Sequence, residues 1–127
     1  MKRKETMTWE PITKAALLQA IKIGQQQLEP SHLVFWNSIK VEPVKWQEPD
    51  YGEAGGGFWV VAVSAPWVMW FNDIEGGFNV SEFIREGFIS SYYCEKDELV
   101  WAVKRLYNVV CERNFIGNRL GPPTKLS

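Results

Sequence analysis

Two carboxylates, Asp73 and Glu75, are the residues whose types and spacing come closest to supporting a reaction. They lie in WVMWFNDIEGGFN, residues 67–79, directly after a strongly apolar run. If that run continued as a strand, the two side chains would share one face, as paired acid and base carboxylates can. An enzyme or a small-ligand-binding protein would then use an aromatic pocket near this pair, with Trp67 and Trp70 in its walls.

The same stretch carries the residue types of a tight turn. Asn72 and Asp73 can bond to nearby backbone groups, and the Gly76–Gly77 pair can adopt positive φ. This pattern favours a turn over a continued strand. We therefore expect no catalytic residue, and the acidic pair stays a hypothesis for ligand binding.

The other reactive residue types do not form recognisable sites. His32 is the single histidine, and no other histidine or cysteine stands at metal-ligand spacing from it. The DIEGG stretch lacks the ligand alternation of a calcium loop, and the glycine run at 55–57 precedes a strand instead of a helix. Cys94 and Cys111 flank a predicted helix that holds them too far apart for a disulfide. We expect free thiols, no metal site and no cofactor.

Composition limits the class of protein. The chain of 127 residues is sized for a single domain, residues 1–127, with flexible or extended tails at 1–8 and 114–127. A net charge of −1 disfavours nucleic-acid binding. No apolar stretch is long enough to span a membrane, and no apolar run follows the basic residues at the start. The expected location is the cytoplasm.

Hydrophobic spacing predicts an α+β fold, with the order helix, antiparallel meander, helix. Thr13 caps a first helix over 14–28, and Pro30 either ends it or starts a second short helix. Four or five strands follow, and Pro43 places the first of them at a sheet edge or at a bulge. Acidic residues begin the last helix, over 97–113. The predicted strands are 38–47, 58–64, 67–72, 78–83 and 87–93.

The two central strands are apolar on both faces, because residues 58–63 and 67–71 do not alternate with polar residues. Two helices cannot cover both faces, so apolar area is expected to remain for the tail, for a second copy or for another protein. Trp101 falls on the polar face of the last helix, where either the tail at 114–127 or a partner would cover it. The candidate binding residues are Trp59, Trp67, Trp70, Asp73, Glu75 and Trp101.

WFNDIEGGFN followed by YYCEKDELVWAV resembles a pattern in uncharacterised small bacterial proteins, some similar in size and composition to immunity proteins of toxin systems. The resemblance covers about 58–110. It departs at Glu95 and Lys96, where those proteins often carry an asparagine that would cap the last helix better. The resemblance implies a bacterial cytosolic α+β protein that works by binding a partner, and it transfers no catalytic residue.

Overall fold

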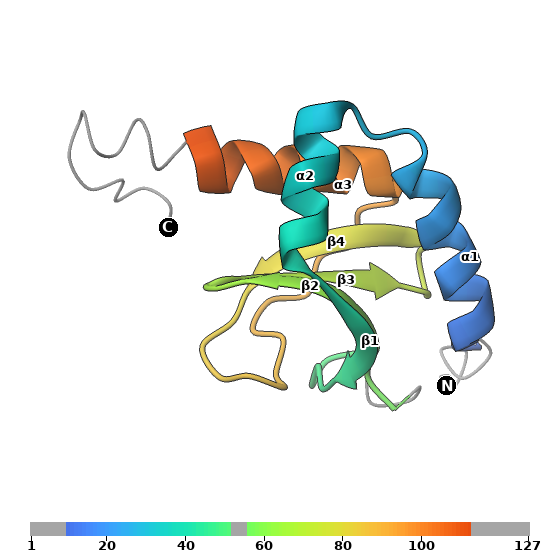
Figure 1. Cartoon of the computed structure of the whole chain (residues 1–127). Coiled ribbons are helices and arrows are strands. Elements are labelled where there is room, and N and C mark those ends of the chain that lie inside the picture. Colours follow the sequence, from blue (N-terminus) through green and yellow to red (C-terminus); the bar gives the residue numbers. More distant parts are fainter. Residues whose placement is uncertain (1–9, 52–55, 113–127) are drawn as a thin grey trace.

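The computed structural model describes residues 10–51 and 56–112, and in these ranges three α-helices and a four-stranded antiparallel sheet form the fold. The predicted α+β class is confirmed. Figure 1 shows α2 and α3 on one face of the sheet and α1 beside one end of its strands, and buried side chains of all three helices join the same apolar cluster. The helices are α1 (Lys14–Gln25), α2 (Pro30–Ile39) and α3 (Leu99–Tyr107), the last continuing as a π-helical turn over Asn108–Glu112; the strands are β1 (Lys40–Trp46), β2 (Phe58–Ser64), β3 (Trp67–Asn72) and β4 (Gly77–Glu82).

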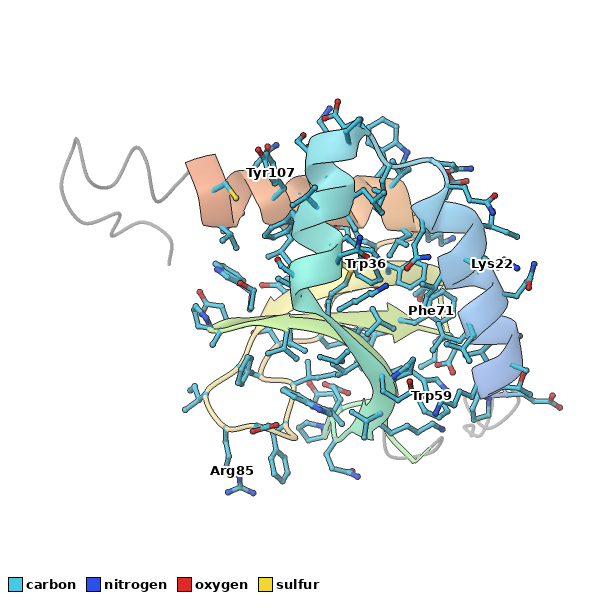
Figure 2. The ribbon with its side chains drawn as sticks, in the orientation of Figure 1. Lys22, Trp36, Trp59, Phe71, Arg85 and Tyr107 are labelled. Carbon is cyan, nitrogen blue, oxygen red and sulfur yellow. The ribbon has the colours of Figure 1, made fainter. Side chains whose placement is uncertain are left out.

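Local chemistry sets the starts of the first two helices. The hydroxyl of Thr13 accepts a hydrogen bond from the Ala16 backbone N–H at 3.1 Å, which confirms the predicted cap of α1. Pro30 stands at the first turn of α2, where its missing N–H costs nothing. A second helix therefore forms, longer than the short one considered from the sequence. Trp36 of α2 is buried in the layer between the helices and the sheet (Figure 2).

The sheet is a simple meander in the order β1-β2-β3-β4, so β1 and β4 are its two edges. The register between β1 and β2 shifts between Lys40 and Val44, the interval that contains Pro43. Because proline cannot donate to a ladder, an edge strand with an irregularity is where it fits. The edge position and the bulge are both confirmed.

The second face of the sheet is covered by residues 83–98, which we call the covering segment. Figure 1 shows this coil passing below the sheet, opposite the helices, before the chain enters α3. Its Phe83, Ile89 and Tyr92 pack against the second apolar cluster, which contains Trp46, Phe58, Val60, Val68 and Trp70. The expectation that the apolar strands leave this area for a tail or a partner is therefore wrong, because the chain covers it with its own coil.

The predicted fifth strand at 87–93 is wrong, because these residues belong to the covering segment and form no strand. This stretch has only an isolated bridge between Phe88 and Gln47, and no ladder. Side chains of β4 bind the covering segment instead, at Ser91 and at Glu95. The Asn79 amide donates to the Glu95 carbonyl at 3.2 Å and its oxygen accepts from the Glu95 N–H at 2.8 Å, while the Ser81 hydroxyl donates to the Ser91 carbonyl at 2.7 Å. These bonds replace a strand pairing.

The remaining expectations concern the last helix, the cysteines, the histidine and the two tails. The last helix begins with Glu98 as its N-cap, close to the predicted start, and both cysteines are free. His32 lies in the first turn of α2 and is buried. The predicted tails, and the covering of Trp101 by residues 114–127, lie outside the described residues. Within the described ranges, no helix has the length and apolar character needed to cross a membrane.

Candidate binding site

The acidic pair lies in a tight turn between β3 and β4. The side-chain oxygen of Asn72 accepts from the backbone N–H groups of Ile74 at 3.0 Å and Glu75 at 3.2 Å. The Gly76 N–H closes the turn onto the Asn72 carbonyl at 2.7 Å, and Gly76 has a φ of 85°. That backbone conformation favours glycine. The turn hypothesis is confirmed, and Asn72, which is buried, organises the turn.

Asp73 and Trp59 hold the start of α1 against the sheet. The Asp73 Oδ2 accepts from the Ile12 N–H at 2.8 Å, and the Trp59 indole donates to the Ile12 carbonyl at 3.1 Å. Figure 2 shows Trp59 near the beginning of α1. Burial raises the pKa of the Asp73 carboxyl above 3.8, although the Ile12 N–H and the charge of Lys45 act in the opposite direction. Both side chains thus have a structural role.

The pocket expected from Trp67, Trp70, Asp73 and Glu75 does not form as one cavity. Trp67 packs with the helix-side cluster, whereas Trp70 is fully buried in the cluster on the opposite face. Trp67 begins β3 and Asp73 follows its end, so they are roughly 20 Å apart along the strand. The four side chains therefore cannot contact one small ligand together.

A cavity does form where β4 and the covering segment separate. The Phe78 N–H donates to the Asp97 carbonyl at 2.8 Å, and the Ser90 N–H donates to the Glu82 carbonyl at 3.4 Å. Between these two bonds the covering segment uses more residues than β4 and bulges away from its edge. The cavity measures about 350 Å³ and is lined by Trp67, Val80, Glu82, Ser91, Tyr93, Glu95 and Arg105.

The charges around this cavity do not cancel. The guanidinium of Arg105 is paired with the carboxylate of Asp97. Glu82 and Glu95 are both exposed at the cavity and add negative charge. Two aromatic side chains, Trp67 and Tyr93, complete its walls. The cavity therefore combines aromatic surface with net negative charge.

Trp101 lies beside this cavity on α3. Its side chain is 55% exposed, as its place on the polar face of the helix predicted, and the Lys104 ammonium lies 5.6 Å from its ring centre. A second, shallower depression is lined by Asp97, Trp101, Lys104, Arg105 and Asn108. Arg105 lines both depressions, so we describe them together as the β4–α3 surface.

Of the six candidate residues, Trp67 and Trp101 belong to the β4–α3 surface, and the other four do not line it. Sequence reasoning missed Glu82, Tyr93, Glu95 and Arg105. The ion pair between Asp97 and Arg105 left no signal either, because Asp97 precedes α3 and the two residues are not at the three- or four-residue spacing of helical side-chain pairs. Within the described ranges, no three His, Cys, Asp or Glu side chains gather in a way that could hold a metal ion.

Comparison with known proteins adds no relative: no family model, no curated protein and no solved structure matches this chain.

Proposed function

We propose that this protein is a non-enzymatic protein-binding module and that the β4–α3 surface is its contact face. The observation that carries the proposal is the exposed indole of Trp101 beside the cavity, with Arg105 lining both depressions. Tryptophan, tyrosine and arginine are the residue types most concentrated in binding hot spots. All three occur together here, because Tyr93 and Trp67 line the same cavity.

Other classes of partner have less support. The net charge of −1 and the carboxylates at the cavity disfavour a polyanion such as nucleic acid. A small-ligand site or an enzyme using Asp73 and Glu75 remains the alternative. It has less support because Asp73 already bonds to the Ile12 backbone and both residues belong to the turn.

The narrower form of the proposal is immunity-type inhibition, in which the protein binds and neutralises a toxin; a homodimer through the same surface is the other form. Binding of a different protein and binding of a second copy through the β4–α3 surface would both bury the exposed Trp101. We place this activity in the cytoplasm, where the exposed thiols of Cys94 and Cys111 would stay reduced.

The test compares the wild type with Trp101→Ala and with the matched control Val44→Ala. Val44 is 51% exposed and lies on β1, the opposite edge of the sheet. Light scattering after size exclusion measures self-association, and affinity capture measures binding of a different protein. We expect one of the two complexes in the wild type and the control, and its loss in Trp101→Ala. A monomer without a partner, or a complex that survives Trp101→Ala, would contradict the proposal.

A further inference from the structure

Among the described residues of the β4 edge, Val80 is the one at which neither outward backbone group has a hydrogen-bond partner. Phe78 and Glu82 use outward-pointing backbone groups to bond the covering segment. Because backbone groups alternate in direction along an antiparallel strand, the N–H and C=O of Val80 also point outward. The described residues supply no hydrogen-bond partner for either group. Val80 also lines the cavity, so the cavity lies at the place on the β4 edge where this donor and this acceptor are unpaired.

An unpaired strand edge is a template for one more strand. An incoming residue opposite Val80 would exchange two hydrogen bonds with it, and its side chain would lie on the helix-bearing face of the sheet. Trp67 lies on that face, because it packs against the helix-side cluster. Glu82 is paired with Trp67 across the two strands, so its side chain lies on the same face. The gap is short, since the bonds at Phe78 and Glu82 close it at both ends.

The chemistry of the cavity selects the incoming side chain. Arg105 is neutralised by Asp97, which leaves the carboxylates of Glu82 and Glu95 as the unbalanced charges. A cation between aromatic walls is attracted both by the carboxylates and by the faces of the rings. At about 350 Å³, the cavity is at the small end of the range for ligand pockets and suits one side chain.

We propose that the gap in the β4 edge binds a short extended segment of a partner protein, with its main chain paired to Val80 and one lysine or arginine side chain in the cavity. This inference rests on the proposed function and identifies which part of the partner the protein recognises. Glu82 and Glu95 supply the charge, Trp67 and Tyr93 supply the ring faces, and Val80 supplies the direction of the main chain.

The test is a titration of the ¹⁵N-labelled full chain with a capped valine–arginine–valine tripeptide, followed by nuclear magnetic resonance. We expect the Val80 amide and the Trp67 indole resonances to shift. The same peptide with glutamate at its centre should leave both unchanged. Methylation of the backbone nitrogen of the arginine removes the N–H that donates to the Val80 carbonyl, and should weaken binding at least fivefold.

Charge variants locate the cation. In Glu82→Gln/Glu95→Gln, the dissociation constant of the arginine peptide should rise at least fivefold, because both unbalanced carboxylates are lost. Glu86→Gln is the matched control: Glu86 is exposed in the covering segment and does not line the cavity, so affinity should be unchanged.

Several outcomes would overturn the inference. The absence of any shift at 10 mM peptide would do so, as would equal shifts with the glutamate peptide. Shifts of Trp67 with agmatine that match those with the peptide, without a shift of Val80, would assign the cavity to free cations instead. If no peptide binds but a complex still depends on Trp101, this inference alone fails; if that complex is also missing, the proposed function fails with it.

Discussion

Replacing Ser81 with alanine should destabilise the protein by about 2–4 kcal/mol, although the change removes a single oxygen atom. The Ser81 hydroxyl accepts from the Trp70 indole N–H at 2.9 Å and donates to the Ser91 carbonyl at 2.7 Å. It is thus the link between the fully buried indole and the backbone of the covering segment.

The magnitude follows from what the alanine variant leaves unpaired. Trp70 is 0% exposed and Ser81 1% exposed, so water cannot replace the hydroxyl at the indole. A buried donor without a partner costs about 1–3 kcal/mol. The carbonyl of Ser91 is only partly buried, and the loss of its bond adds about 1 kcal/mol.

The assay is urea unfolding of the full chain, with Ser90→Ala as the matched control. Ser90 is an exposed serine of the same covering segment, and its replacement should change the unfolding free energy by no more than about 0.5 kcal/mol. A double-mutant cycle with Trp70→Phe isolates the bond and should give a coupling of roughly 0.5–3 kcal/mol. A Ser81→Ala variant as stable as Ser90→Ala would refute the reasoning.

Three further predictions concern the turn and α3. Gly77→Ala should lower the free energy of unfolding by about 3 kcal/mol, because the new Cβ would stand 2.3 Å from the Lys96 Cα. Gly76→Ala is the control: its Cβ would meet no atom, and its positive φ should cost about 1 kcal/mol. A smaller loss in Gly77→Ala than in Gly76→Ala, measured by urea unfolding, would contradict the prediction. Burial favours the neutral Asp73 carboxyl, so the stability that it contributes is full below pH 3.8 and is lost as pH rises through its raised folded pKa. The unfolding free energy of the wild type relative to Asp73→Asn should therefore fall as pH rises, and a rise would be inconsistent with a buried carboxylate. Trp101→Ala should change thermal stability by no more than about 0.5 kcal/mol, since the indole is exposed, and a larger loss would indicate a structural role.

The sequence predicted the elements whose signals are local. Thr13 marks the start of α1, and Pro43 marks an irregular edge strand, because each acts on backbone groups close to it in the chain. The apolar runs of β2 and β3 correctly indicated that both faces of the sheet are covered. They could not indicate what covers the second face.

The covering segment escaped prediction because long-range side-chain bonds hold it. Asn79 and Ser81 alternate with Phe78 and Val80, a pattern that is also typical of a strand facing water on one side. Their burial depends on a coil that returns about ten residues or more later in the chain, and no local periodicity encodes that return. The helical spacing, in contrast, was enough to place Trp101 on an exposed face.

The candidate site combines both kinds of information. Trp101 could be found from the sequence, whereas Glu82, Tyr93 and Glu95 come together only because the covering segment bulges away from β4. Asp73 and Glu75 looked more reactive than these residues in the sequence because they are close neighbours there. In the fold, the Asn72 side chain bonds the backbone N–H of Glu75, and Asp73 bonds the backbone of Ile12.

The most direct test of the β4–α3 surface as a contact face is photo-cross-linking inside the source cell, with benzoylphenylalanine in place of Trp101, of Tyr93 or of Val44. Trp101 and Tyr93 line the two depressions of this surface, and Val44 is exposed on the opposite edge. We predict the same discrete protein product from the first two positions and none from Val44. No product from either position on the β4–α3 surface, or the same product from all three, would contradict the account.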